Sequence, residues 1–443
     1  MVIFLRLIII FLTGFIQKSY AFHYQARIYT GGFASREEFK EASDGAHRND
    51  LARLSERFYL SSSHLLSKNI SFAGDLRDRY DFFDKVDKTN LELKSGNKLQ
   101  LRQLSTQYES PHKFFKGDLG RFPVAETGNS AYTDGLNIKF QVTRSFSSGT
   151  FGGLNPKRPD QTYLQFNKNS KTTGFYLDYI PPYTSWEKNL SFTNAFYIQQ
   201  FDSQTDRSVW YQNLIYQWNE SNRFYSTYNL DFTPKTNLQF LNTSYWKKIN
   251  SLWSLTPSIL SIDNIEYNRR KSVRERLPSS PYREGDLDNK FKLNSSYTFQ
   301  VSGLYGKRQF DHKTKYELKA GSIFSNFISK RFSAYFKLGY RADFVNEDYF
   351  TQFGFGYFQK SLELNLDEEL ALENRPGVRK DLPSITDASM SYFISNSIYG
   401  SFSLQYAKDR LANIFSCFLK IGFRFGNEPI PALRDGAPPL GRI

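Results

Sequence analysis

The 443-residue chain has few of the residues on which small stapled or metal-bound folds depend. It contains a single cysteine, Cys417, and two methionines. One thiol can form neither an internal disulfide nor a cysteine-based zinc site. After residue 21 no stretch is long and apolar enough for a transmembrane helix, and the mean hydropathy is negative. The composition therefore excludes a helical membrane protein and a disulfide-stapled domain.

The sequence also lacks the short motifs that mark the common enzyme classes. None of its five histidines lies in an HExxH motif, and no GxSxG motif, glycine-rich phosphate loop or zinc-ligand spacing occurs. His47 has Asp44 and Asp50 three residues to either side, but a solvated polar face is the commoner reason for such a charge run. The acidic residues around Glu368 lack the spacing of a calcium loop. We therefore expect no catalytic residues, no metal site and no cofactor.

The first 21 residues predict an export signal. Arg6 supplies a positive start, residues 7–16 form an almost unbroken apolar run, and Ser19 and Ala21 frame a small-x-small cleavage site. The apolar run is too short to span a bilayer comfortably, so an uncleaved anchor is the weaker alternative. No cysteine follows it, which argues against a lipoprotein anchor. We expect residues 1–21 to be a signal peptide.

Aromatic and basic residues are what the chain has in abundance. It carries 42 Phe and 29 Tyr, and aromatic residues make up 17% of an otherwise polar composition. A barrel in lipid places aromatic residues outside, in girdles, and keeps its interior polar. The formal net charge is +14, and without Arg6 and Lys18 the 58 basic residues become 56 against 44 acidic ones. Such an excess suits nucleic acid, anionic lipid or an anion-attracting pore, and an export signal removes nucleic acid from this list.

Alternation with a period of two is the main structural signal. Apolar residues alternate with polar ones over residues 223–232, 332–341, 362–367 and 415–425. Runs of about ten residues joined by turn sequences have the length needed to cross a bilayer at a tilt. The pattern predicts an all-β fold over residues 22–425, a transmembrane antiparallel up-and-down β-barrel with a polar lumen.

The number of strands and the irregular stretches follow less directly from the pattern. We expect an even number of strands, about 14–18. Residues 35–54 are charged, with apolar positions at helical spacing, and predict a short helix in the lumen or at the periplasmic rim. Residues 269–288 and 370–386 are expected to be loops, and the four prolines near the end predict a flexible tail over residues 426–443. A soluble secreted β protein is the alternative, but long strands joined as hairpins argue against it.

The last alternating run resembles the C-terminal targeting signal of outer-membrane barrels, an aromatic and apolar strand that ends in an aromatic residue. The residues that carry this resemblance are Phe415, Leu419, Ile421, Phe423 and Phe425. The chain departs from the family because a tail follows the terminal aromatic. The resemblance implies a Gram-negative outer-membrane protein, placed by the barrel insertion machinery among lipid and lipopolysaccharide.

A second segment resembles a recurrent element of porin-type channels. Residues 119–122 read Leu-Gly-Arg-Phe, and residues 133–136 read Thr-Asp-Gly-Leu. In such channels a strand ends in Gly-Arg and an Asp-Gly step begins the next strand. The resemblance implies that Arg121 and Asp134 face the lumen or a constriction, while an ordinary hairpin is an equal alternative.

These features predict a porin-like channel through which small polar solutes diffuse. The residues expected to line the lumen or its constriction are Arg121, Asp134, Arg223, Lys337, Arg341, Glu363, Asp367, Lys420 and Arg424. The basic members favour anionic solutes, and the acidic members temper that preference. The alternative is a non-conducting barrel with a structural or envelope-assembly role, anchored through the basic stretch 269–288 or the tail. Whether the barrel is a monomer or a homo-oligomer is left open.

Overall fold

The described residues of the chain form one antiparallel sheet of 22 strands. The structure, a computed structural model, describes residues 23–39, 48–63, 67–85, 96–128, 131–156, 166–181, 189–233, 236–263, 281–309, 311–326, 328–342, 347–373, 382–395, 397–408 and 412–426. No helix among these residues is long and apolar enough to cross a membrane. The expected signal peptide lies outside the described residues, and so does the expected tail, apart from Gly426.

The strands follow one another along the chain with no other regular element between them except one short 3-10 helix in the described part. They are β1 His23–Phe39, β2 Arg48–Ser63, β3 Ile70–Lys85, β4 Gly96–Glu109, β5 Phe115–Pro123, β6 Tyr132–Gln141, β7 Phe146–Pro156, β8 Phe166–Tyr179, β9 Asn189–Phe201, β10 Gln204–Asn219, β11 Asn222–Asp231, β12 Asn237–Lys248, β13 Trp253–Ile262, β14 Tyr282–Lys292, β15 Tyr297–Arg308, β16 Thr314–Ser325, β17 Phe332–Ala342, β18 Glu347–Gln359, β19 Leu362–Glu373, β20 Ser384–Phe393, β21 Ile398–Lys408 and β22 Ala412–Gly426. The 3-10 helix η1 spans Ala125–Thr127, between β5 and β6.

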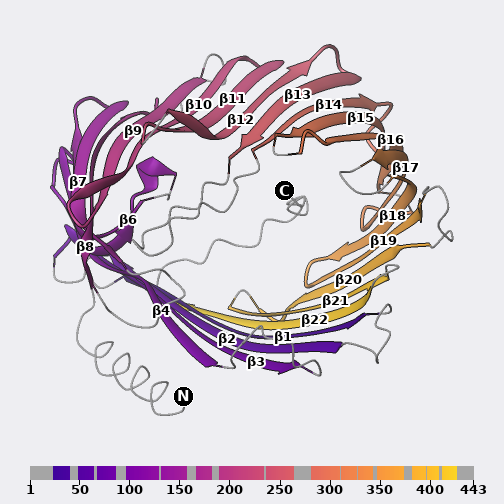
Figure 1. Cartoon of the computed structure of the whole chain (residues 1–443), viewed down its shortest axis with the longest axis horizontal. Helices are drawn as coiled ribbons and strands as arrows, with labels where there is room; N and C mark the ends of the chain where they lie inside the picture. The colour runs from indigo at the N-terminus through magenta and orange to yellow at the C-terminus, as the bar shows by residue number, and fades with distance from the viewer. Residues whose placement is uncertain are drawn as a thin grey trace.

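Pairing of the first strand with the last closes the sheet. β1 pairs with β2 on one side and with β22 on the other, where Ala26 lies opposite Phe425 and Phe39 opposite Ala412. Figure 1 shows the strands as a closed ring. A closed sheet leaves no open edge, which is what a sheet in lipid requires. With strands about 4.8 Å apart and tilted by about 40°, a ring of this many strands is roughly 45 Å across at the backbone.

The strand count of 22 is higher than the 14–18 expected. Two of the strands lie where composition argues against a strand. Glycine is depleted in strands, yet residues 146–156, which contain Gly149, Gly152 and Gly153, form β7. The charged residues 282–288, expected to belong to a loop, lie in β14, where alternate acidic side chains face the polar interior. Polar residues on the inner face make a barrel strand look like a loop in composition.

The short helix expected over residues 35–54 is not found in the described part of that stretch. Residues 35–39 belong to β1 and residues 48–54 to β2. Their charges pair across the two strands: Arg36 lies opposite Asp50, and its Nε is 3.2 Å from an oxygen of that carboxylate. Cross-strand ion pairing therefore accounts for charges that had suggested a solvated helix face.

The two ends of the barrel differ in the length of their connections. An even number of strands puts the start of β1 and the end of β22 at the same end. Most connections at that end are short, such as residues 220–221 and 360–361. The connections β13–β14 and β19–β20, at the other end, are long. Outer-membrane barrels show this asymmetry, with the short turns in the periplasm.

The outer face carries two sets of paired aromatic side chains, one near each end. Near the short turns, the rings of Trp218 and Tyr245 stack with centroids 5.6 Å apart. Near the long connections, Tyr340 contacts Tyr316 and Tyr349, with centroids 5.5 and 4.9 Å apart. Aromatic girdles at both interfaces are characteristic of transmembrane barrels. The outer surface between them exposes many large apolar side chains, as lipid contact requires.

A buried ion pair holds the wall together where the ladder between β4 and β5 ends. Arg121 of β5 and Asp134 of β6 lie directly opposite each other. Their two contacts, Nε to Oδ1 at 2.6 Å and Nη2 to Oδ2 at 2.7 Å, form a bidentate pair. Arg121 also donates through Nη1 to the carbonyl of Leu101, at 3.1 Å, beyond the point where β4 last pairs with β5.

The expected placement of this pair in a lumen constriction differs from what the structure shows. Arg121 lies opposite Leu104, which is 44% exposed on the outer face, whereas the next residue, Phe122, is buried on the inside. Because successive side chains alternate between the two faces of a strand, Arg121 and Asp134 lie on the face opposite to the lumen. Arg121 donates a hydrogen bond to the carbonyl of Leu101, which lies beyond the last backbone pair between β4 and β5.

Removal of one partner of this pair should destabilise the barrel strongly. Asp134→Ala leaves a buried guanidinium uncompensated, and we expect a loss of about 3–5 kcal/mol in the free energy of unfolding. Urea unfolding of the refolded protein, followed by tryptophan fluorescence, measures this. The double variant Arg121→Met/Asp134→Leu should recover most of the loss.

The exposed pair Arg36–Asp50 provides the control, because its arginine side chain is 50% exposed. Arg36→Ala should cost less than about 1 kcal/mol. Equal losses for Arg36→Ala and Asp134→Ala would show that the buried pair has no special part in the wall.

Candidate functional site: the polar inner face

The inner face can be assigned strand by strand from the pairing registers. Asn137 on β6 lines a pocket inside the barrel, while its neighbour Leu136 is 45% exposed on the outside. Residues directly opposite each other in a ladder share a face. Asn137 lies opposite Asp118 on one side and Phe151 on the other, and the registers carry this assignment around the ring.

By this assignment, most residues expected in the lumen lie on the inner face. These are Arg223 on β11, Lys337 and Arg341 on β17, Glu363 and Asp367 on β19, and Lys420 and Arg424 on β22. The ammonium of Lys420 lies 4.6 Å from the centroid of the Tyr29 ring and 5.7 Å from that of Tyr399. Arg341 is bonded to Asp348 and Glu369, so its charge is compensated.

The apolar residues of the last strand occupy the opposite face. Phe415, Leu419, Ile421 and Phe423 are between 37% and 51% exposed, and Phe425 shares their face. They point outward, where lipid would lie. Their role as an insertion signal stays a prediction.

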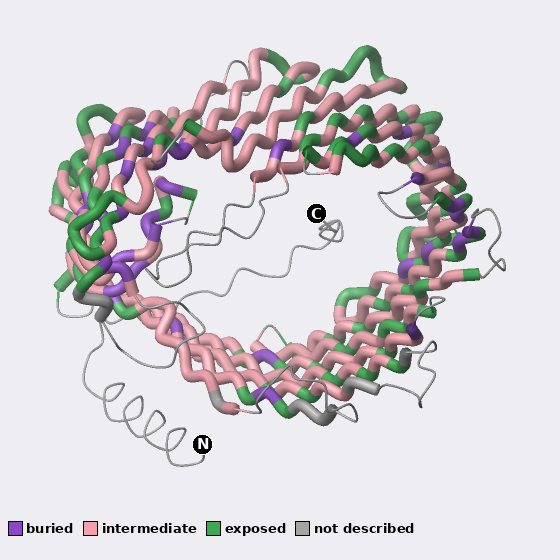
Figure 2. Tube along the Cα trace, in the orientation of Figure 1, coloured by how far each residue is buried: buried purple, intermediate pink, exposed green. Residues whose placement is uncertain are grey.

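One described segment turns into the interior of the barrel. After β5, residues 124–128 run inward and include η1, which Figure 1 shows inside the ring beside β6 and β9. Val124 and Ala131 pack with Tyr176, Tyr197 and other residues of β5–β10 in the main buried apolar cluster. Figure 2 shows buried residues gathered on this side of the ring, while most of the wall is half-buried. The segment narrows the interior next to β5–β10.

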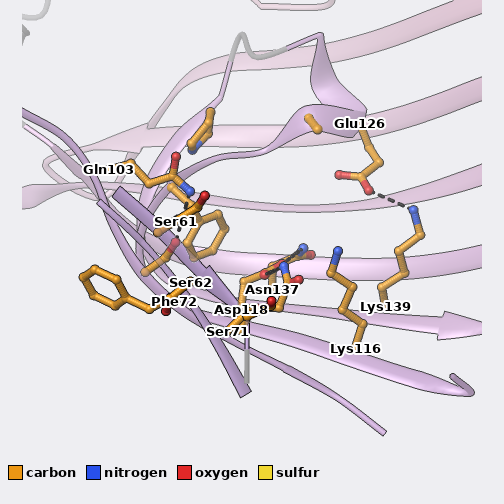
Figure 3. Close-up of a pocket in the computed structure, with 17 residues that line it drawn as sticks. Ser61, Ser62, Ser71, Phe72, Gln103, Lys116, Asp118, Glu126, Asn137 and Lys139 are labelled. Atoms are coloured by element: carbon orange, nitrogen blue, oxygen red, sulfur yellow. Dashed lines mark hydrogen bonds and ion pairs between the residues drawn. The ribbon is translucent and has the colours of Figure 1, made fainter. Parts of the chain in front are cut away.

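A pocket of about 480 Å³ lies on the inner face beside this segment. It is lined by residues of β2–β6 and of η1 and its flanks, among them serine hydroxyls, amides and four charged side chains (Figure 3). The Nζ of Lys139 is 3.0 Å from Glu126 and 2.6 Å from Asp178. Asp118 accepts hydrogen bonds from the side-chain amides of Gln107 and Asn137. The sequence does not reveal this pocket, because its residues meet only through the registers of five neighbouring strands.

A second feature that the sequence analysis missed is a basic wall formed by β22 and β1–β4. Its inward basic residues are Lys420, Arg424, Arg27, Arg53, Arg57, Arg77, Arg79 and Lys98, with Arg102 at a bulge of β4. Asp75 pairs with Arg57, and Asp81 pairs with both Arg53 and Arg79. The remaining charges are uncompensated by ion pairs in the described part of the chain. Alternation in residues 48–63 and 70–85 would have revealed these arginines.

Inward acidic residues gather elsewhere, on β18–β20 and on β14. They are Asp348, Glu363, Asp367, Glu369, Glu373, Asp387, Glu284, Asp286 and Asp288. Several are bonded to neighbours, as Asp367 is to the hydroxyl of Tyr335 at 2.7 Å. Among the described residues, no group of three or more His, Cys, Asp or Glu side chains is arranged to hold a metal ion.

Comparison with known proteins gives matches by structure alone. No family model matches the chain, and no curated protein matches it in sequence. The translocation pore of the P pilus usher PapC aligns with a TM-score of 0.53 at 8% identity, covering 90% of this chain and 99% of that chain. Pseudomonas aeruginosa OccK11 (OpdR) aligns with a TM-score of 0.42 at 8% identity, covering 91% and 96%. Pseudomonas putida OprB, at low pH, gives 0.33 at 9% identity, covering 94% and 96%.

At these identities the likenesses concern the fold. The likeness to PapC agrees with what the structure shows directly: a closed antiparallel sheet, an apolar outer face with aromatic pairs near both ends, and a polar inner face. That combination is stable only in a bilayer that a barrel can cross. The chain is therefore a closed β-barrel of the transmembrane type, with a fold like that of the PapC translocation pore.

Proposed function

We propose that the barrel is a diffusion channel for small polar solutes, with a preference for anions. The observation that carries this proposal is the inner face, which presents charged side chains without ion-pair partners around a ring of 22 strands. An ionised side chain without a partner cannot be buried in a dry interior, because desolvation would cost several kcal/mol or more. Those charges therefore require water in the lumen.

The width of the ring supports the same conclusion. A backbone ring roughly 45 Å across exceeds what inward side chains can fill, and barrels of this size enclose a channel or a plug. In the described part of the chain, the inward excursion between β5 and β6 occupies only the side next to β5–β10. Solutes would pass beside it.

Preference for anions follows from the basic wall. Arg77 makes no ion pair with any described residue. It lies close enough to four other arginines to be repelled by their positive charges; these are Arg53, Arg57, Arg79 and Arg102. A lumen wall of one charge sign raises the local concentration of ions of the opposite sign. The acidic residues of β18–β20 weaken this preference less than their number suggests, because Asp348 and Glu369 are bonded to Arg341.

Single-channel recording in a planar bilayer tests the proposal. The refolded mature protein should give stable conductance steps, and the reversal potential under a salt gradient should show anion selectivity. A folded, heat-modifiable barrel without conductance would contradict the channel. It would favour a structural or envelope-assembly role, the alternative function of such a barrel.

Neutralising Arg77 should lower the selectivity without unfolding the barrel. In Arg77→Gln we expect the anion-over-cation permeability ratio to fall by roughly a factor of two, because the focused positive potential weakens. The reversal potential under the same salt gradient measures the change.

Arg283 offers a matched control because it lies on β14 opposite Ser261, on the outer face. Arg283→Gln removes the same charge outside the lumen and should leave the permeability ratio unchanged. If both variants shift it equally, net charge rather than the basic wall sets the selectivity.

A further inference from the structure

The pocket beside η1 contains two opposite charges that do not neutralise each other. Lys116 and Asp118 lie two residues apart on β5 and both face the pocket. No ion pair joins them, and neither forms an ion pair with another described residue. Side chains at this spacing on one face of a strand are about 7 Å apart at Cβ, close enough for one small molecule to touch both.

Lys116 is held next to another cation. It lies directly opposite Lys139 in the ladder between β5 and β6. Figure 3 shows the two side chains extending side by side, with Lys139 joined to Glu126. Lys139 is compensated by Glu126 and Asp178, so these carboxylates are already engaged. Like charges directly opposite each other are destabilising, so an anionic group bound at Lys116 would be stabilised there.

Asp118 is fixed in place with its negative charge retained. One carboxylate oxygen accepts from Nε2 of Gln107, and the other accepts from Nδ2 of Asn137 at 2.9 Å. Asn137 is in turn oriented by the hydroxyl of Tyr176, which donates to its Oδ1 at 3.0 Å. Neutral amides orient a carboxylate but do not cancel its charge. Asp118 is therefore a preorganised acceptor for a cationic group.

Serine hydroxyls complete the polar lining of the pocket. Ser61, Ser63, Ser71 and Ser105 line it, and their registers place all four on the inner face. A hydroxyl can donate a hydrogen bond to a carboxylate and accept one from an ammonium group. These side chains therefore suit a small polar ligand that carries both charges.

We infer that this pocket binds a small zwitterion of the α-amino acid type, with its carboxylate at Lys116 and its ammonium at Asp118. The four charged side chains of the pocket, Lys116, Lys139, Asp118 and Glu126, sum to zero. A dianion would be repelled by the two carboxylates and a dication by the two lysines, whereas a zwitterion satisfies both free charges. The inference rests on the proposed function only in that the solute reaches the pocket through the lumen.

Calorimetric titration of the refolded barrel in detergent micelles tests the inference without requiring conductance. The probes are L-glutamine as the zwitterion, mannitol as a neutral polyol, succinate as a dianion and putrescine as a dication. We expect saturable binding of L-glutamine, and at least tenfold weaker binding of the other three. Comparable binding of mannitol or succinate, or no saturable binding of L-glutamine, would overturn the inference.

Variants locate the site. Lys116→Gln and Asp118→Asn should each weaken L-glutamine binding by roughly tenfold or more, because each removes one charge-assisted contact. Lys116→Arg keeps the charge and should retain binding within a few-fold. Lys307→Gln, on β15 opposite Arg283 and therefore on the outer face, is the matched control and should leave the affinity unchanged.

Heat-modified migration on a gel establishes that each variant folds. Folded Lys116→Gln and Asp118→Asn that bind as tightly as the wild type would refute the site. The proposed channel and the proposed binding pocket can be refuted independently of each other. A barrel that conducts but binds no L-glutamine refutes the pocket, whereas one that binds L-glutamine but does not conduct refutes the channel.

Discussion

The pairing of β1 with β22 is the constraint on which the rest of the structure depends. Every backbone amide and carbonyl in a lipid environment needs a partner within the protein, and only a closed ladder supplies one for each strand. The long register from Gln25 opposite Gly426 to Phe39 opposite Ala412 provides that closure. Where one ladder is shortened, at the end of β5, the side chain of Arg121 takes over and bonds both Asp134 and a carbonyl of β4. Closure of the sheet and the side chain of Arg121 thus both provide hydrogen-bond partners for backbone groups that would otherwise lack them.

Closure also divides the side chains into two chemical environments. The strict alternation of a strand sends Leu419, Ile421 and Phe423 outward and Lys420 and Arg424 inward. The outward set is stable only in lipid and the inward set only in water, so the wall separates the two. The inward turn around η1 adds the one apolar cluster of the described interior. It also covers one side of a pocket in which Lys116 and Asp118 of β5 lie opposite Lys139 and Asn137 of β6.

Much of the fold could be read from the sequence, and much of the site could not. Alternation around Arg223, Lys337 and Lys420 predicted the barrel, because a period of two is a local property. The strand containing Gly149 was missed, because glycine is rare in strands; here a Cβ at that position would lie 2.3 Å from the Tyr176 ring, so the small residue is required by a neighbour on another strand. The basic wall was overlooked although its alternation was visible. The pocket could not be predicted, since the meeting of Ser61, Lys116 and Lys139 depends on registers that no single strand encodes.

The most direct test of the account is the reactivity of single cysteines introduced on the two faces of one strand. In a Cys417→Ser background, Lys420→Cys places a thiol on the inner face of β22 and Leu419→Cys places one on the outer face. Both refolded proteins would be exposed in lipid vesicles to a charged, water-soluble thiol reagent. The account predicts rapid modification at position 420 and little or none at position 419, because only the lumen is hydrated. Equal modification at both positions, or modification at 419 alone, would contradict a water-lined lumen enclosed by a lipid-facing wall.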